Sequence, residues 1–575
     1  MIKSSTMRKI VFFVLALSLS LAQETKRYYL TVEGKAPRAS FLPTTAVVTV
    51  LTAEDIKKMP FTTLAEILQF LPSLTVVRRS QASFDLSVRG ASPKRTLILL
   101  NGMRINDPQS EHFNMEVPIS LQQIERIEIF KGGTSTFYGS SSAAGGINIV
   151  TSSGGNTLSA VAGEKGLFGF AASASLGNFS LGLSSRKSRG YYPGREFDLR
   201  DVSAQYTGKK ARLFFGAGVK EMGEANFYAP YPSWERIGRY VLSGNLRLGG
   251  VELGLLSRTL RDHFVLDRER PLWYENRHKN FLHSLRAAKR FSLPRGEITL
   301  GLEGNSEGIR SGRLGNHHRE SLALVGEFTR AGGGFSLDLG LRAEVFSAGK
   351  PFYGFYLGYQ KSLGKAFLIS ASVGNSFRLP SFTELYYSSP ANVGNPDLRP
   401  EKSLSADLSL ETRTVAGRGT VSLFWRRDRD LVDWVRTGIH SPWRAANLAP
   451  IQRFGLEFSW GWRWRRGIFS LGFLRTFLHY RMEETPKYAL ALDKLKLSSS
   501  LIFYLGRIGF SSALSYREMV LGQKGIFLNA RISLRLPGKI RVFLQGSNLF
   551  NTVIEEIPGV KIEGRWLSAG LRLDL

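Results

Sequence analysis

The chain has 575 residues and no cysteine, so we expect at least two domains and exclude disulfide frameworks, thiolate zinc sites and a cysteine-linked lipid anchor. Its formal net charge is +30, from 77 Lys and Arg against 47 Asp and Glu. These cations are scattered along the chain, and no nucleic-acid-binding motif accompanies them. We therefore expect no nucleic-acid partner and a basic surface that faces anionic lipopolysaccharide.

The N-terminus predicts export. Residues 7–9 form a short basic region, residues 10–21 form an apolar run, and Ser20 and Ala22 supply the small residues of a cleavage site. This pattern is typical of a cleaved signal peptide over residues 1–22, starting at Met1 or Met7, and a buried N-terminal helix is the alternative. No later stretch is long and apolar enough for a membrane-spanning helix, which leaves a secreted soluble protein or an outer-membrane β-barrel.

Two short helices are predicted early in the next region. Thr52 and Thr63 each stand three residues before an acidic side chain, which is the spacing of a capping box. Pro60 and Pro72 end the two helices, because proline cannot continue a helix.

Short strands follow these helices. Apolar residues alternate with polar ones in several segments, and one apolar run is closed by the turn pair Asn101-Gly102. The mixture predicts one compact α/β domain over residues 43–152, preceded by an extended periplasmic tail over residues 23–42. The predicted strands include residues 84–88, 97–100, 127–129 and 147–149.

Residues 153–575 have a different pattern, in which apolar and polar residues alternate with period two to the end of the chain. A soluble sandwich could also give this alternation. The number and length of the segments favour a closed transmembrane antiparallel β-barrel of about 22 strands, since lipid allows no open sheet edge. The tryptophans expected in aromatic girdles at the membrane surfaces are Trp425, Trp434, Trp443, Trp460, Trp462 and Trp464.

Several segments together resemble TonB-dependent outer-membrane receptors. They are LILLNGMRINDP (97–108), IERIEIFKGGTSTFYGSSSAAGGINIVT (124–151), SFRLPSFTELYY (376–387), GNPDLRPEKS (394–403) and NLFN (548–551). Within that family the chain is most similar to the vitamin B12 receptor type, on NDPQSEHFNMEVPIS (106–120), ANFYAPYPSWE (225–235) and LWYENRH (272–278). The resemblance implies that the α/β domain is a plug inside the barrel lumen.

The resemblance also implies partners. The tail segment Tyr29, Leu30, Thr31, Val32 and Glu33 is similar to a Ton box, which pairs as an added strand with TonB, energised by the inner-membrane ExbB–ExbD complex. We expect a monomer in outer-membrane lipid and lipopolysaccharide that imports a scarce metal chelate. Cobalamin or a related corrinoid is favoured, with a ferric siderophore or haem as alternatives.

Two groups of plug residues are predicted to act in transport. Polar and aromatic residues on connections are candidates for ligand contacts at the plug apex, together with the outer barrel loops, although ordinary loop roles are the alternative. These candidates are Ser80, Gln81 and Ser83 in one loop and Gln109, His112, Phe113 and Asn114 in another. The resemblance implies that a charged set locks the plug to the barrel wall, namely Arg89, Glu125, Arg126, Glu128 and Lys131.

No catalytic constellation is recognisable, so we expect no enzyme. The glycine-rich run 139–146 lacks the Lys-Ser/Thr of a phosphate-binding loop and precedes a strand. His317 and His318 are expected to be an exposed pair in a polar loop, without a third metal ligand. No cofactor is expected, and calcium is unsupported because no Asp-rich loop occurs in the early barrel. A passive porin, an outer-membrane enzyme and an adhesin are the rival classes.

Overall fold

The structure is a computed structural model. The predicted signal peptide (1–22) and Ton-box-like segment (29–33) lie outside its described residues. No helix among the described residues is long and apolar enough to cross a membrane. The described residues are 45–46, 48–110, 112–152, 154–227, 230–438, 441–481, 485–490, 492–557 and 559–575.

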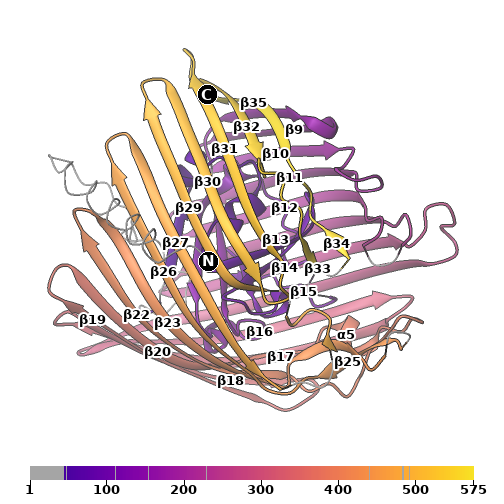
Figure 1. Cartoon of the computed structure of the whole chain (residues 1–575). Coiled ribbons are helices and arrows are strands. Elements are labelled where there is room, and N and C mark those ends of the chain that lie inside the picture. Colours follow the sequence, from indigo (N-terminus) through magenta and orange to yellow (C-terminus); the bar gives the residue numbers. More distant parts are fainter. Residues whose placement is uncertain are drawn as a thin grey trace, which may run out of the picture.

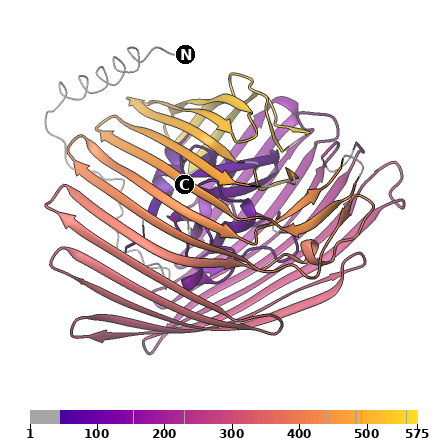
Figure 2. The same cartoon turned by 60° about the horizontal axis from the view of Figure 1, so that its bottom comes forward.

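A closed antiparallel barrel of 22 strands surrounds a smaller domain (Figures 1 and 2). The last strand pairs with the first, so the sheet has no free edge. The barrel strands are β8 (Thr157–Gly163), β9 (Leu167–Leu176), β10 (Phe179–Ser188), β11 (Phe197–Thr207), β12 (Ala211–Gly223), β13 (Trp234–Leu248), β14 (Val251–Val265), β15 (Glu275–Leu293), β16 (Gly296–Ser311), β17 (Gly315–Gly332), β18 (Phe335–Phe346), β19 (Phe352–Leu363), β20 (Phe367–Arg378), β22 (Glu401–Thr414), β23 (Gly417–Arg429), β26 (Ile451–Trp464), β27 (Gly467–Tyr480), β29 (Asp493–Leu505), β30 (Ile508–Met519), β31 (Lys524–Arg535), β32 (Ile540–Ser547) and β35 (Trp566–Asp574).

The two faces of each barrel strand differ in polarity. On β13, Tyr240 and Leu242 are exposed on the outer face, whereas Ile237, Arg239 and Val241 are buried toward the lumen. Alternate side chains point to opposite faces of a strand, so one face meets lipid and the other meets the plug. The predicted fold class, a transmembrane barrel of about 22 strands with an α/β plug in its lumen, is confirmed.

The plug is built around a five-stranded sheet in the order β1-β6-β7-β4-β5, with a separate β2–β3 hairpin. Its elements are β1 (Val48–Thr52), α2 (Ala53–Lys58), α3 (Leu64–Gln69), β2 (Leu74–Ser80), β3 (Ser83–Val88), η1 (Pro93–Arg95), β4 (Leu97–Leu100), β5 (Met103–Arg104), η2 (Leu121–Gln123), β6 (Ile124–Lys131), α4 (Ser135–Tyr138) and β7 (Gly145–Thr151). The two predicted capping boxes are present, at Thr52 with Asp55 and at Thr63 with Glu66. These local signals fix where both helices begin.

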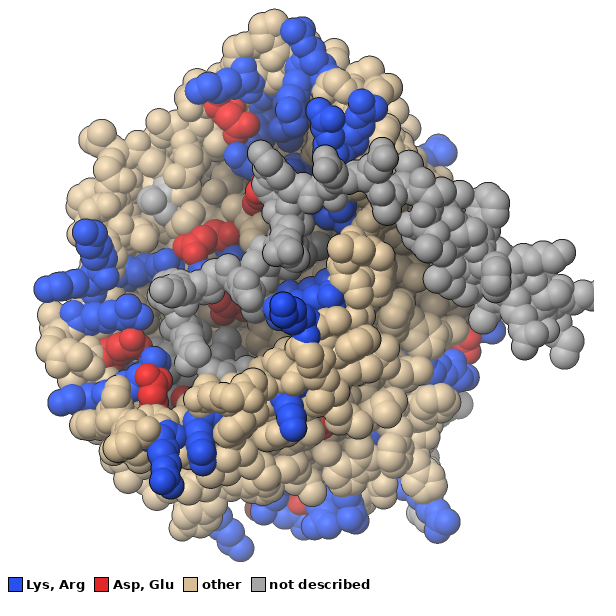
Figure 3. Space-filling model, turned by 90° about the vertical axis from the view of Figure 1, so that its left-hand side faces the viewer, with Lys and Arg blue, Asp and Glu red and all other residues tan. Residues whose placement is uncertain are grey.

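The two ends of the barrel differ. One end has short turns, and in Figure 3 Lys and Arg side chains gather around its rim. The other end, on the right of Figure 1, carries longer connections, which we call the loop end. Longer loops are typical of the extracellular side of such barrels. The loop-end elements are η3 (Glu164–Gly166), α5 (Phe382–Tyr386), β21 (Asn392–Val393), β24 (Val432–Arg436), β25 (Trp443–Asn447), β28 (Thr485–Pro486), β33 (Glu555–Ile557) and β34 (Val560–Lys561).

Two expectations from the sequence are wrong. Trp434 and Trp443 belong to a four-stranded sheet of the loop end, β21-β25-β24-β28, and not to a barrel girdle. Alternation alone does not distinguish a barrel strand from a strand within a loop. His317 and His318 lie in β17 and not in a polar loop, and His317 is half-buried with its ring stacked on Tyr386 at 3.6 Å between centroids.

Candidate functional site

The plug is joined to the barrel wall by buried ion pairs. Arg89 follows β3, and its guanidinium contacts Asp407 of β22 and, at 2.8 Å, Glu457 of β26. Lys131, at the end of β6, contacts the same Glu457. Burial lowers the pKa of Lys131, and Glu457 offsets only part of this shift because the cationic Arg89 shares that carboxylate.

A second group of ion pairs joins the plug turn η1 to the loop end. Lys94 contacts Glu384 of α5 at 2.5 Å, and Arg378 contacts the same carboxylate at 2.9 Å. Arg95 contacts Glu401 at 2.9 Å, and Arg378 contacts that carboxylate as well, at 2.6 Å. This chain of charges connects α5 at the loop end to the plug through buried side chains.

The protonation states in this group depend on the ion pairs that its members form. Burial alone would raise the pKa of the Glu384 carboxyl, but Arg378 and Lys94 hold it well below its usual range. Burial alone would lower the pKa of Lys94, but the Glu384 carboxylate raises it. The charged forms of both groups are therefore favoured in the folded protein.

Two cations of the barrel wall cap the short plug helices. Lys496 of β29 donates to the carbonyl of Leu71 at 2.9 Å and also to the carbonyls of Gln69 and Leu74, where α3 ends. Arg531 of β31 donates to carbonyls just after α2, those of Met59 and Phe61. Carbonyls at helix C-termini lack intrahelical partners, so these contacts stabilise the helices and attach them to the wall.

The predicted lock residues divide into two sets. Arg89, Glu125 and Lys131 contact the wall, with Glu125 at 3.1 Å from Arg212 of β12. Arg126 contacts Glu125 and Glu128, while Glu128 accepts from Asn148 of β7, so these bonds lie within the plug. The reasoning from sequence missed Lys94, Arg95, Lys496 and Arg531, although Arg378, Glu384 and Glu401 lie within the quoted family motifs.

Of the candidates at the tip of the β2–β3 hairpin, one is accessible. Ser80 and Ser83 are buried, and the Ser80 hydroxyl accepts from the Ala82 amide at 3.1 Å. Gln81 is half-buried, and its backbone amide donates to Glu563 of the loop end at 3.2 Å. The hairpin tip therefore lies directly beneath the external loops.

Among the candidates in the second plug loop, three are buried. Gln109 donates to Asp262 at 3.3 Å and accepts from Asn280 at 2.8 Å, both on barrel strands. Phe113 packs in an apolar cluster with barrel residues, and the Asn114 side chain accepts from the backbone amide of Asp107 at 2.7 Å. Gln109 and Phe113 therefore hold the plug loop against the wall, and Asn114 fixes the conformation of the loop itself.

His112 is the accessible candidate of this loop. It is half-buried, its Nδ1 lies 3.2 Å from Asp85, and its ring meets Tyr488 edge-on at 6.0 Å between centroids. Tyr488 follows β28, so this contact joins the plug to the loop-end sheet. Candidates from both plug loops thus reach the same end of the lumen.

Cations and aromatic rings gather around Tyr488, and we call Arg436, Trp443, Lys487 and Tyr488 the apical cluster. Arg436 lies 4.5 Å from the Trp443 ring centroid, and Lys487 lies 5.3 Å from Trp443 and 5.2 Å from Tyr488. Buried Asp433 accepts from the Tyr488 amide at 2.9 Å, which fixes this segment. The cluster can offer π-faces and positive charge to a ligand.

Within the described part of the chain, no three His, Cys, Asp or Glu side chains gather in a group that could hold a metal ion. The plug fills the lumen, and the accessible predicted ligand contacts, Gln81 and His112, lie at its loop end.

Comparison with known proteins agrees with this geometry. A family model described as TonB-dependent Receptor Plug Domain matches residues 42–146, and one described as TonB dependent receptor-like, beta-barrel matches residues 131–549. The vitamin B12 transporter BtuB of Vibrio vulnificus (strain YJ016) is 23% identical over 466 residues, covering 72% of each chain. An iron-regulated outer membrane virulence protein of Vibrio cholerae is 25% identical over 439 residues, covering 65% of this chain and 64% of the relative.

Solved structures share the fold. The siderophore receptor PirA from Pseudomonas aeruginosa has a TM-score of 0.71 at 19% identity, covering 92% of this chain and 98% of that one. The FrpB iron transporter from Neisseria meningitidis has a TM-score of 0.76 at 14% identity, covering 92% and 99%. With both family models matched and the plugged barrel present, the chain belongs to the TonB-dependent receptors of the outer membrane.

Proposed function

We propose that this receptor binds a metal chelate at its loop end and imports it with energy supplied through TonB and the ExbB–ExbD complex. The plug fills the lumen and is attached to the wall by buried ion pairs, so passage requires that these contacts be released. The barrel has no energy source of its own. Residues 29–33 are the proposed attachment point for TonB, by strand pairing.

Cobalamin or a related corrinoid is the favoured ligand. The observation that carries this choice is the chemistry of the two predicted ligand contacts that are accessible at the loop end, since Gln81 offers an amide and His112 an aromatic imidazole. A corrin ring bears amide side chains and a broad apolar face, which hydrogen-bonding amides and aromatic rings can contact without a strong charge. Relatives described as vitamin B12 transporters support the choice.

A ferric siderophore is the second candidate, and haem ranks below it. The apical cluster favours this alternative, because Arg436 and Lys487 beside aromatic rings would attract an anionic chelate. The iron-regulated relative is consistent with it. The two candidates differ in which residues contact the ligand, since the first uses Gln81 and His112 of the plug and the second the cationic loops.

The test is a binding measurement on detergent-purified protein with cobalamin, cobinamide and a panel of ferric siderophores, by calorimetry or fluorescence quenching. Micromolar or tighter binding of a corrinoid is expected. Such binding of a siderophore, with none for either corrinoid, would overturn the choice. The paired variants Gln81→Ala and Lys487→Gln then assign the contact surface, because each removes a group that only one of the candidates needs.

A further inference from the structure

The outer wall of the barrel carries a dense group of cations near the loop end of β10–β16. The side chains of Arg200, Arg236 and Arg277 are 74%, 55% and 70% exposed. In contrast, the inward-facing Arg239 of β13 is buried against the plug. The exposed set therefore faces away from the lumen, toward the surrounding membrane.

The strand registers arrange these side chains in two rows, which we call the outer basic rows. In the second row, Arg261 of β14 pairs directly with Lys279 of β15, which pairs directly with Arg310 of β16. Like charges at directly opposed positions destabilise a sheet. The row nearer the loops runs Lys187, Asp198, Glu221, Arg236, His263, Arg277, and the second row contains Arg200, Arg261, Lys279 and Arg310.

The charges of the second row are only partly neutralised. Arg200 contacts Asp198 at 2.6 Å. Among the residues that the structure describes, no acidic side chain forms a salt bridge with Arg261, Lys279 or Arg310. A bound anion would relieve the repulsion between these three neighbours. Its negative charge would attract all three cations, and this attraction is stronger next to the low-dielectric membrane than in bulk water.

The position of the rows on the wall indicates how deep in the membrane such an anion would bind. Toward the middle of the same strands, the outer face carries exposed apolar residues, including Phe215, Leu242 and Leu285. Charges are tolerated near the membrane surface and disfavoured within the apolar band. The outer basic rows therefore lie at the level of the outer-leaflet headgroups.

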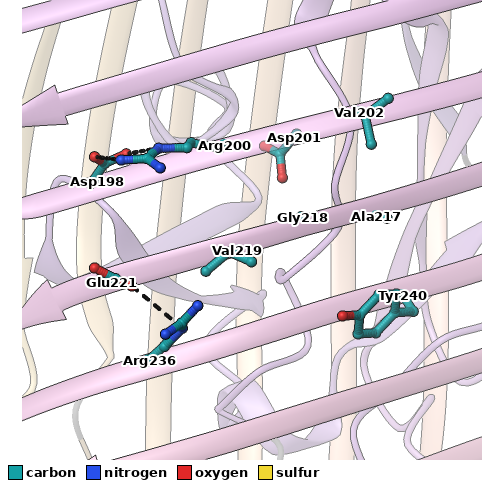
Figure 4. A pocket seen from close by; sticks show the side chains of 10 residues that line it. All are labelled: Asp198, Arg200, Asp201, Val202, Ala217, Gly218, Val219, Glu221, Arg236 and Tyr240. Carbon is teal, nitrogen blue, oxygen red and sulfur yellow. Dashed lines mark hydrogen bonds and ion pairs between the residues drawn. The ribbon is translucent and has the colours of Figure 1, made fainter.

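Beside the rows, the outer wall is hollowed. A shallow cavity of about 400 Å³ lies over β11–β13, with Arg200 and Arg236 on one side and the small side chains of Val202 and Ala217 toward Tyr240 (Figure 4). Figure 4 views these strands from outside, with the plug behind them. The rim carries both signs of charge, because Asp198 and Glu221 pair with these two arginines. The excess positive charge lies beside the hollow, at Arg261, Lys279 and Arg310. A hollow with apolar walls next to such cations fits an amphipathic lipid that has an anionic head.

Positive charge is unevenly distributed over the outer face near the loops. On the outer face of β18–β20, the positions near the loops are Ala343, Val345, Tyr353 and Asn375, which carry no charge. A second outward pair of cations, Lys402 and Arg429, lies near the loop end of β22 and β23, but Phe377 stands on the other side of Lys402, so no row of three opposed cations forms there. We propose that the outer basic rows form a docking site for the phosphorylated headgroup of lipopolysaccharide, with its acyl chains along the apolar wall below.

The test uses the triple variant Arg261→Gln, Lys279→Gln, Arg310→Gln in the full-length protein. The matched control is Lys289→Gln, Arg330→Gln, Lys361→Gln, which removes the same charge from exposed positions of the wall near the short turns. Delipidated protein is incubated with lipopolysaccharide carrying both lipid A phosphates, with the same lipid after dephosphorylation, or with phosphatidylglycerol. Bound lipid is counted by native mass spectrometry, and folding is checked by heat-modifiable gel migration.

Wild type and control should bind the phosphorylated lipopolysaccharide equally, and the triple variant should bind it at least about tenfold more weakly. Dephosphorylation should weaken wild-type binding to a similar degree, and phosphatidylglycerol should bind less well than lipopolysaccharide. Equal binding by the triple variant, equal loss in the control, or equal binding of either comparison lipid would overturn the proposal.

Discussion

The inner and outer faces of the same barrel strands use charge in opposite ways. On the inner face, Arg239 of β13 contacts Glu116 of the plug at 3.4 Å and Asp201 of the wall at 2.7 Å, and it is buried. On the outer face of the same strand, Arg236 contacts Glu221 at 3.3 Å while largely exposed. A buried charge that loses its partner destabilises a protein strongly, whereas an exposed one does so weakly. The inner charges therefore hold the plug, and the outer ones are available to the membrane.

Removing the plug altogether should give the largest effect. Deletion of residues 43–150 should leave a folded barrel, because its strands close on themselves without the plug. In planar bilayers the deleted protein should conduct ions, and the intact protein should conduct little. If the intact protein conducts like an open porin, the inner charges do not hold a closed plug.

The next largest effect should come from changes in residues 29–33, the segment through which TonB would pull on the plug. The double variant Leu30→Pro, Val32→Pro removes two backbone donors and fixes two φ angles, which prevents strand pairing with TonB. Uptake of labelled ligand by whole cells should fall to background, while binding persists. Thr25→Pro, outside the segment, is the control and should transport normally. Normal uptake by the double variant would contradict the assignment of residues 29–33 as the TonB-binding segment.

Matched Glu→Gln changes compare the two faces directly. Glu457→Gln leaves buried Arg89 and Lys131 without their shared carboxylate and should cost about 3 kcal/mol of plug stability. Glu221→Gln on the outer face should cost less than about 1 kcal/mol. Hydrogen exchange of the plug amides measures the loss of stability in each variant. Similar protection in the two variants would contradict the proposed difference between inner and outer charges.

Acid should weaken the inner contacts selectively. The pKa of Glu384 is lowered in the folded protein by Arg378 and Lys94, so the stabilisation is complete above the ordinary glutamate pKa of about 4.3 and is lost as the pH falls below it. Amide exchange around η1 should therefore accelerate between pH 5 and pH 3 (roughly the range of carboxyl titration). In Glu384→Gln this acceleration should be smaller, and an unchanged pH profile would exclude Glu384 as its source.

The smallest effects should come from the accessible plug surface. His112→Ala and Gln81→Ala should each weaken ligand binding by about tenfold or less, since each removes one contact. Phe113→Ala should instead lower stability, because Phe113 packs in an apolar cluster with Leu167 and Phe197. Unchanged affinity in a His112→Ala, Gln81→Ala double variant would move the site up into the apical cluster.

The fold could be predicted from the sequence because its signals are local. The capping boxes at Thr52 and Thr63 fix two helices, and strict alternation marks the barrel strands. The same signal misplaced Trp434 and Trp443, since a strand in a loop alternates just as a barrel strand does.

The candidate site was less accessible to sequence reasoning. Loop position suggested exposed ligand contacts, yet Gln109 and Asn114 are buried, because the wall closes over the plug loop. Nothing near Lys496 or Arg531 in sequence indicates that each would cap a plug helix more than four hundred residues earlier.

By itself, the sequence determined the polarity of each strand, the caps of the plug helices and the order of plug and barrel, because each depends on neighbours along the chain. Only the tertiary structure decided which charges are buried in pairs and which face the membrane. That outcome depends on barrel closure and strand register, which bring Glu457 to Arg89 and align Arg261 with Lys279. Inward and outward arginines look alike in the sequence, and the closed barrel separates them.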